Sequence, residues 1–180
     1  MTAALPPLTL VIGAAASGKS AFAERLITAT GAPALYIATA EAHDAEMRAK
    51  IAAHRARRGA GWTTVEAARD LAPPLAAARP HQPVLLDCAT LWLTNQLLAE
   101  ADLAAEQSHL LQSLAACPAP VIIVTNEVGA GLVPETTLGR RFRDAQGRLN
   151  QALAAQADLV VLVSAGLPLV LKGHLPGTAP

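Results

Sequence analysis

The sequence predicts a single-domain α/β fold, with a mostly parallel central sheet flanked by helices. Apolar runs alternate with helical patterns along the 180 residues. The runs lack the polar alternation of a half-exposed strand, which indicates strands buried on both faces, as in a parallel sheet covered by helices. Hydrophobic residues make up 52% of the chain and charged residues 16%, as in globular proteins. We expect one domain over residues 1–180, with its core at 8–172 and a flexible tail at 173–180.

The apolar runs give the predicted strands. These are Leu8–Ile12, Ala34–Ala38, Trp62–Val65, Pro83–Cys88, Val121–Thr125, Leu159–Val163 and Leu169–Leu171, the last after a turn at Gly166–Pro168. The predicted helices are Lys19–Thr30, Asp44–Arg58, Thr90–Ala116 in two pieces, and Leu138–Ala155. The spacing of the last helix places one set of residues on a single face, namely Leu138, Phe142, Ala145, Leu149 and Ala152.

Charge and composition argue against several classes of partner. Lysine plus arginine is 14 and aspartate plus glutamate is 14, so no net positive charge attracts nucleic acid or an anionic membrane. Aromatic residues are 3%, too few for base-stacking platforms. No run reaches the roughly 20 apolar residues of a membrane span, and the N-terminus lacks signal-peptide features. We expect a cytoplasmic protein in which Cys88 and Cys117 are buried, reduced thiols.

One motif predicts a phosphate site. The segment GAAASGKS matches GxxxxGK[ST], and it stands between a predicted strand and a predicted helix, as that motif requires. Backbone N–H groups of such a loop surround phosphate oxygens, the lysine reaches the β- and γ-phosphates, and the hydroxyl after it ligates Mg²⁺. The predicted triphosphate-binding residues are Gly13, Ala14, Ala15, Ala16, Ser17, Gly18, Lys19 and Ser20.

A phosphate loop usually works with a carboxylate at the end of a nearby strand. Asp87 closes the predicted strand PVLLD, so we expect it to hold Mg²⁺ together with Ser20; its alternative role is to cap the following helix. Glu127, after VIIVTN, is the second candidate, and it is otherwise a solvated loop acid. The glycines at 129 and 131 predict a mobile loop that closes over a substrate.

A histidine lies among arginines on the second predicted helix. Helical spacing puts Met47, Ile51, His54 and Arg58 on one stripe, and two further arginines, at 55 and 57, flank the histidine. Guanidinium groups suit a polyphosphate, and histidine is a competent nucleophile toward phosphorus. Residue chemistry alone leaves open a packed or surface histidine on an amphipathic helix.

These segments together resemble the bifunctional adenosylcobinamide kinase / adenosylcobinamide-phosphate guanylyltransferase family of cobalamin biosynthesis. The matching pieces run in order over nearly all of residues 8–172. They are GAAASGKS, YIATAEAHDAEMRAKIAAHRARRGAGWTTVE, LLDCATLWLTNQLL, VTNEVGAGLVPETTLGRRFRDAQGRLNQALAAQAD and LVVLVSAGLPLVLK.

The resemblance implies two reactions. A nucleoside triphosphate, ATP or GTP, first phosphorylates the corrinoid adenosylcobinamide. GTP then donates GMP to that phosphate through a histidine that matches His54, giving adenosylcobinamide-GDP and pyrophosphate. The resemblance also implies a RecA-like fold, a homotrimer, and a set of guanine-nucleotide contacts at Ile37, Ala38, Thr39, Ala40, Arg55, Ala56, Arg57, Arg58, Glu66 and Asp87.

The chain departs from the family at the phosphate loop. The family loop often reads GGARSGKS, whereas this chain has Ala14 and Ala16, so the arginine that could contact phosphate is missing. Two other interpretations stay open at this point. One is a P-loop kinase of another small molecule without a covalent histidine step, and the other is a RecA-like module that binds nucleotide and acts on nucleic acid or a protein.

Overall fold

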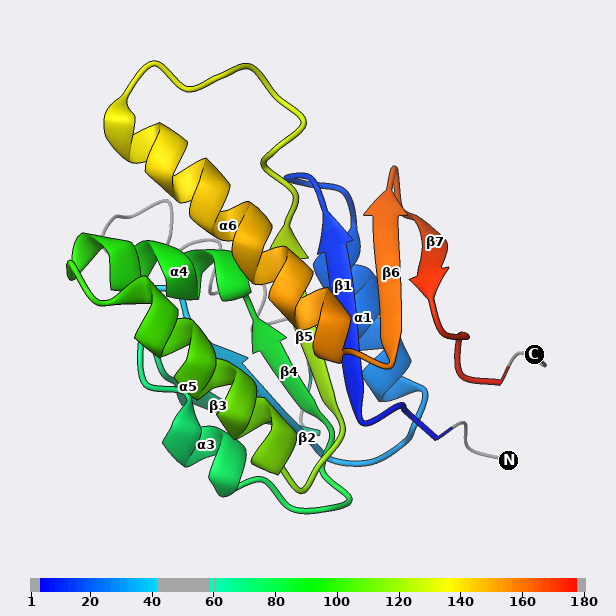
Figure 1. The fold of residues 1–180 in the computed structure, drawn as a ribbon. Helices are drawn as coiled ribbons and strands as arrows, with labels where there is room; N and C mark the ends of the chain where they lie inside the picture. Colours follow the sequence, from blue (N-terminus) through cyan, green and yellow to red (C-terminus); the bar gives the residue numbers. More distant parts are fainter. Residues whose placement is uncertain (1–3, 42–58, 60, 178–180) are drawn as a thin grey trace.

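Seven strands form one sheet in the computed structural model, which describes residues 4–41, 59 and 61–177 (Figure 1). The strand order is β3-β2-β4-β5-β1-β6-β7. The strands are β1 (Leu8–Gly13), β2 (Ala34–Ala38), β3 (Trp62–Glu66), β4 (Val84–Asp87), β5 (Val121–Asn126), β6 (Leu159–Ser164) and β7 (Leu167–Lys172). Every neighbouring pair is parallel except β6 and β7, which are antiparallel. The predicted mostly parallel sheet is confirmed.

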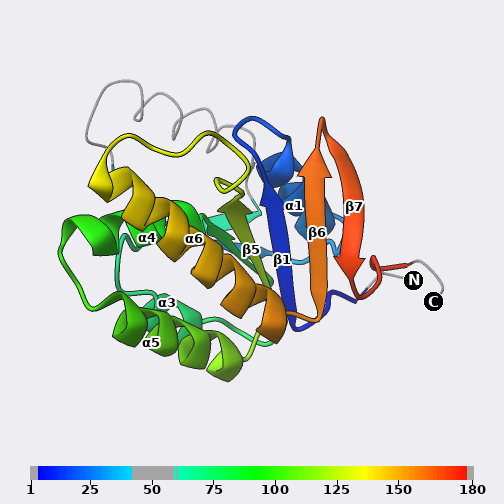
Figure 2. The same cartoon turned by 45° about the horizontal axis from the view of Figure 1, so that its top comes forward.

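Helices cover both faces of the sheet. They are α1 (Lys19–Thr28), α3 (Ala72–Ala76), α4 (Ala89–Leu98), α5 (Leu103–Ala116) and α6 (Thr137–Gln156). The helix α1 lies on one face, and α3 to α6 lie on the other (Figures 1 and 2). The helix expected at Asp44–Arg58 falls outside the described residues. None of the described helices combines the length and apolarity needed to cross a membrane.

Two apolar cores, one on each face, hold these layers together. Along β1, Leu10 belongs to the core under α3 to α6, and the next residue, Val11, belongs to the core under α1. Both side chains are fully buried. Because successive residues of a strand point to opposite faces, a strand covered on both sides is apolar throughout, which explains the unbroken apolar runs.

The carboxyl ends of three strands meet at one edge of the sheet. Gly13 at the end of β1 is opposite Asn126 at the end of β5, and Asp87 at the end of β4 is opposite Val124. Ligands of parallel α/β sheets bind at this edge. The fold therefore brings the phosphate loop and the predicted metal carboxylate to the same edge.

Several details differ from the sequence-based expectation. The short helix α3 was missed, because its two prolines discourage a helix prediction although they are tolerated in a first turn. The last strand begins at Leu167, and the turn before it is at Ala165–Gly166. Leu138 is 48% exposed instead of packed, since α6 begins beyond the sheet (Figure 1). Cys117 is only half-buried; both cysteines are free thiols, as expected.

Candidate functional site

The phosphate loop joins β1 to α1, and its glycines are required by its geometry. Gly18 has a φ of 92° immediately before α1, a conformation that disfavours any residue with a Cβ. A Cβ at Gly13 would collide with Ser17 Oγ and would lie 2.6 Å from the carbonyl oxygen of Val163. The motif glycines therefore keep the loop compact and leave its backbone free to face a phosphate.

Short backbone hydrogen bonds hold the loop on both sides. Within the loop, Ser17 N donates to the Ala14 carbonyl at 3.2 Å. From the β5 side, Glu127 N donates to the Gly13 carbonyl at 3.1 Å, and from the β6–β7 turn, Gly166 N donates to the Ser17 carbonyl at 2.8 Å. Of these bonds only the first uses a loop N–H, that of Ser17, so the other N–H groups of the loop can face an anion.

The side chain of Lys19 is the cation of the site. Its Nζ donates to the Ala14 carbonyl at 3.1 Å. Burial lowers the pKa of Lys19 below its ordinary 10.5, and the neighbouring Cys88 and Asp87 oppose that shift. Burial and the Asp87 charge raise the pKa of the Cys88 thiol to about 11, so the thiol is neutral at pH 7. Asp87 is therefore the negative group that balances Lys19 across the site.

Asp87 is fixed by Tyr36 of the neighbouring strand β2 and by Thr39, the residue that follows this strand. Tyr36 Oη donates to Asp87 Oδ2 at 3.2 Å, and Thr39 N donates to the Asp87 carbonyl at 3.2 Å. The peptide bond between Asp87 and Cys88 is cis. The Thr39 hydroxyl accepts from Cys88 N and donates to the Cys88 carbonyl, both at 2.8 Å. The backbone around Asp87 is thus held by hydrogen bonds on both sides.

The residues expected to hold Mg²⁺ fit that ion chemically. Ser20 and Asp87 offer a hydroxyl and a carboxylate, and Mg²⁺ prefers oxygen ligands, few of them from protein. The Ser17 hydroxyl is buried without a hydrogen-bond partner within the described residues, but it lies against Gly13 within the loop and is not counted as a ligand. No cluster of three or more histidine, cysteine or acidic residues is found in the described part of the chain. A phosphate-loop Mg²⁺ site does not need such a cluster, because phosphates and water supply the remaining ligands.

The expected guanine-nucleotide contacts differ in accessibility. The side chains of Ile37 and Ala38 are buried in the core. Thr39 is fully buried, and its carbonyl accepts from Asn95 Nδ2 at 2.9 Å. Ala40 is half-buried, and Glu66 is exposed at the end of β3. Among the described members of this set, Ala40, Glu66 and the half-buried Asp87 have accessible side chains, while Ile37, Ala38 and Thr39 support the strand end.

The remaining predicted residues cannot be placed. The nucleophile candidate His54 and its neighbours Arg55, Ala56, Arg57 and Arg58 lie outside the described residues. Their roles stay predictions.

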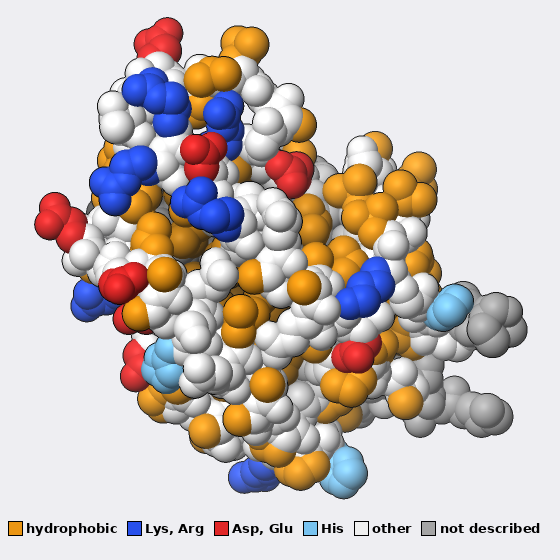
Figure 3. All heavy atoms as spheres, in the orientation of Figure 1, with side chains coloured by type: hydrophobic (Ala, Val, Ile, Leu, Met, Phe, Trp, Pro, Cys, Tyr) orange, Lys and Arg blue, Asp and Glu red, His pale blue; other side chains and the backbone are white. Residues whose placement is uncertain are grey.

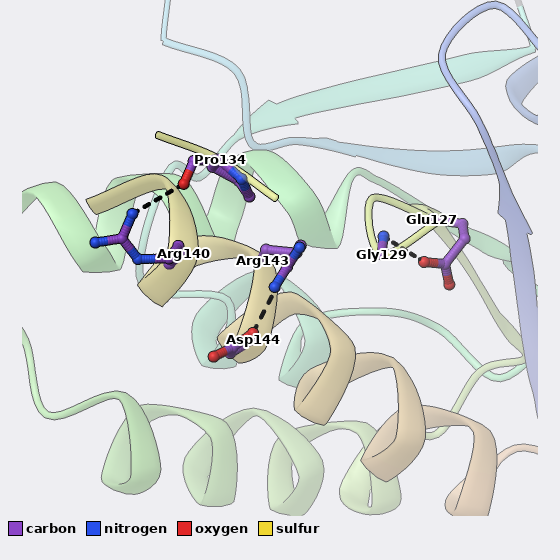
Figure 4. Close-up of polar contacts among 6 residues, drawn as sticks. All are labelled: Glu127, Gly129, Pro134, Arg140, Arg143 and Asp144. Carbon is purple, nitrogen blue, oxygen red and sulfur yellow. Dashed lines mark hydrogen bonds and ion pairs between the residues drawn. The ribbon is translucent and has the colours of Figure 1, made fainter. Parts of the chain in front are cut away.

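A loop after β5 borders the site, and it carries contacts that the sequence did not suggest (Figure 4). Glu127 is exposed, and its Oε1 accepts from Gly129 N at 2.6 Å. Arg140 on α6 donates to the Pro134 and Glu135 carbonyls at 2.9 and 2.7 Å, which ties the end of the loop to the helix. The ion pair of Arg143 with Asp144, at 3.7 Å, is between adjacent surface residues and contributes little.

A buried polar cluster beneath this loop was also missed. Thr125 on β5 donates to Asn150 Oδ1 at 2.8 Å and accepts from Gln146 Nε2 at 3.0 Å. Asn150 Nδ2 donates to the Asn126 carbonyl at 3.1 Å, and Asn126 N donates to Thr90 Oγ1 at 2.8 Å. The cluster fixes the end of β5 next to the phosphate loop. Polar residues on the apolar stripe of α6 were its only sequence signal.

Comparison with solved structures shows the same fold. The RadB recombinase superposes with a TM-score of 0.54 and 19% identity, covering 88% of this chain and 74% of that chain. The flagellar accessory protein FlaH from Methanocaldococcus jannaschii gives a TM-score of 0.54 and 12% identity, covering 98% of this chain and 83% of that chain. The expected RecA-like P-loop fold is confirmed.

Relatives known by sequence are much more similar. The bifunctional adenosylcobalamin biosynthesis protein CobP of Pseudomonas aeruginosa is 47% identical over 92% of this chain and 97% of its own length. The bifunctional adenosylcobalamin biosynthesis protein CobU of Escherichia coli is 42% identical over 92% of this chain and 99% of its own length. A family model described as cobinamide kinase / cobinamide phosphate guanyltransferase matches residues 9–171.

Proposed function

The chain belongs to the cobinamide kinase / cobinamide phosphate guanyltransferase family, and from this membership we propose how its residues carry out the two reactions. The enzyme is a transferase of cobalamin biosynthesis that binds nucleotide at a P-loop. In the first reaction, ATP or GTP phosphorylates the aminopropanol hydroxyl of adenosylcobinamide. In the second, GTP gives GMP to the new phosphate, and pyrophosphate leaves.

The observation that carries this proposal is the position of Lys19. Its amine is hydrogen-bonded to the phosphate loop, and it lies within electrostatic reach of Asp87 two strands away. A cation in the loop and a carboxylate across from it are the two charges that phosphoryl transfer requires.

In the kinase reaction the chain's own groups position the triphosphate. The N–H groups of the loop and Lys19 hold the β- and γ-phosphates, and Ser20 and Asp87 would hold Mg²⁺. When bound, Mg²⁺ neutralises charge on the transferring phosphoryl group. The oxygen of the corrinoid hydroxyl forms its bond to the γ-phosphorus as the bond to the β-phosphate oxygen breaks, so the nucleoside diphosphate leaves and the hydroxyl proton passes to water.

In the guanylyl reaction His54 acts as the nucleophile. The neutral imidazole attacks the α-phosphorus of GTP, the bond to the β-phosphate oxygen breaks, and pyrophosphate leaves. The negative charge on the leaving pyrophosphate is offset by Arg55, Arg57 and Arg58. The corrinoid phosphate then attacks the same phosphorus and releases His54. His54 and these three arginines lie outside the described residues. The step is therefore supported by their setting in the sequence and by family membership.

The same family resemblance supports a homotrimer in the cytoplasm. Ile37 to Ala40 and Glu66 are proposed to border the guanine nucleotide, with Ala40 and Glu66 as the accessible side chains.

Conversion of substrate tests the proposal directly. The protein is incubated with adenosylcobinamide, ATP, GTP and Mg²⁺, and the corrinoid products are identified by mass. We expect the phosphate and then the GDP derivative. Lys19→Ala should lose both products, whereas Lys172→Ala, on the edge strand β7, should keep both. A corrinoid that stays unmodified, or a Lys19→Ala variant with normal turnover, would refute the assignment.

A further inference from the structure

The turn between β6 and β7 forms a wall of the phosphate loop. Ala165 and Gly166 have φ values of 51° and 78°, so the turn is tight. Gly166 N donates to the Ser17 carbonyl at 2.8 Å, and a Cβ at Gly18 would lie 3.1 Å from Gly166 Cα. The tip of the hairpin lies beside the end of β1 in both ribbon views (Figures 1 and 2). Any part of a bound ligand that extends from the phosphate loop on this side must pass over the β6–β7 turn.

The hairpin presents an apolar surface at that point. Leu167, the first residue after the turn, is 71% exposed, and Leu169 is 59% exposed. Leu167 pairs with Ser164 and Leu169 pairs with Leu162, so both lie on the face of the sheet that carries α6. Hydrophobic side chains gather on this hairpin in the space-filling view (Figure 3). Exposed apolar surface next to a ligand site is typical of a binding surface.

The in-line geometry of γ-phosphoryl transfer limits where the nucleoside can lie relative to the acceptor. The acceptor and the leaving group lie on opposite sides of the γ-phosphorus in an in-line displacement. Asp87 ends β4, which is separated from β1 by β5, whereas β6 is on the other side of β1. If the acceptor approaches from the Asp87 side, then the rest of the nucleotide extends toward β6 and β7.

We propose that the β6–β7 turn, with Leu167 as its apolar contact, is the subsite for the nucleoside of the triphosphate that phosphorylates the corrinoid. This inference rests on the proposed function. The glycine at the tip leaves room for the ribose, because no atom of the described residues lies within 4 Å of a Cβ built there. A purine base then covers Leu167. This subsite lies on the opposite side of the loop from Ala40 and Glu66, so the two reactions place their nucleosides on different sides of one phosphate site.

Two probes separate the nucleoside from the phosphates. Binding of inorganic tripolyphosphate and of the β,γ-imido analogue of ATP, each with Mg²⁺, is measured by calorimetry for the wild type and for Leu167→Ala. Truncating the leucine removes apolar contact with the base, so the ATP analogue should bind about fivefold to tenfold more weakly. Tripolyphosphate should bind unchanged. Leu98→Ala is the matched control, because Leu98 is 64% exposed on α4, and it should change neither affinity.

Each other outcome has a definite meaning. Equal affinity of Leu167→Ala and wild type for the ATP analogue overturns the subsite, as does an equal loss for both probes. A smaller molecular mass of Leu167→Ala in light scattering, with both affinities unchanged, shows that a second copy covers the surface instead and also overturns it. A wild-type protein that binds neither probe contradicts the proposed function itself.

Discussion

At the level of single residues, Lys19 combines two opposing effects. Burial disfavours its charge and is the larger effect; Asp87 favours it, and Cys88 does so only where its thiol, with a pKa of about 11, is ionised. A bound triphosphate adds negative charge and so favours the protonated amine. Nucleotide binding is therefore coupled to the protonation of this one side chain.

This coupling predicts an alkaline loss of affinity. The pKa of Lys19 lies below 10.5, so in the free protein the amine loses its proton at a lower pH than an ordinary lysine does. The affinity for tripolyphosphate should fall as pH rises through that pKa. Lys19→Arg, which stays charged, should bind without this loss. The control variant Lys172→Arg should show the same alkaline loss of affinity as the wild type. Calorimetry across the alkaline range measures the profile, and a Lys19→Arg protein with the wild-type profile would contradict the explanation.

Asp87 predicts a magnesium effect. Replacing it with asparagine keeps the size of the side chain but removes the charge that would attract Mg²⁺. Asp87→Asn should therefore need a higher Mg²⁺ concentration for half-maximal activity, or should be inactive, with an unfolding curve close to that of the wild type. Asp70→Asn, on the loop before α3, is the control. If both variants titrate with Mg²⁺ like the wild type, Asp87 is not part of the metal site.

The positions of the phosphate loop and of Asp87 in the fold could be predicted from the sequence, because each depends on local order: a motif between a strand and a helix, and an acid at a strand end. The role of Thr39 could not be predicted in the same way. Its hydroxyl bonds Cys88, 49 residues away, and no local pattern marks such a pair.

At the level of elements, α6 does more than cover the sheet. Its N-terminal turns hold the loop after β5 through Arg140, and its buried Gln146 and Asn150 bond the end of that strand. The helix was predicted from its apolar spacing. Its polar contacts were not, since glutamine and asparagine on a helix are usually exposed.

Removing one side chain of the buried polar cluster around Thr125 should lower the free energy of unfolding. Asn150→Ala leaves the Thr125 hydroxyl and the Gln146 amide with fewer partners in a buried site. Each unsatisfied buried polar group costs about 1–3 kcal/mol, so the free energy of unfolding should fall by at least that amount. Gln151→Ala, at the next and exposed position, should change it little. Chemical denaturation compares the two variants. A loss no larger than that of Gln151→Ala would show that the cluster is unimportant for stability.

At the level of the whole molecule, the sheet order explains why residues far apart in sequence form one site. The phosphate loop follows β1, yet its neighbours come from β5 and from the β6–β7 turn, more than a hundred residues later. The sequence predicted seven strands in a mostly parallel sheet. It did not determine their order, because buried apolar runs are alike and do not specify which neighbours they pair with.

The central claim is that one phosphate site serves two transfers, the second of them through His54. The most direct measurement is the intact mass of the protein after incubation with GTP and Mg²⁺, followed by peptide mapping. We predict one GMP per chain, on His54, through a bond that is labile in acid and stable in base. Labelling should fall as pH drops below about 6.5, because the neutral imidazole attacks.

Two variants are compared with the wild type in the same measurement of GMP labelling. His54→Ala should take up no GMP while still phosphorylating adenosylcobinamide, since transfer to a hydroxyl does not need this nucleophile. His109→Ala, on α5, should be labelled like the wild type. A GMP adduct on another residue, or undiminished labelling of His54→Ala, would contradict the account.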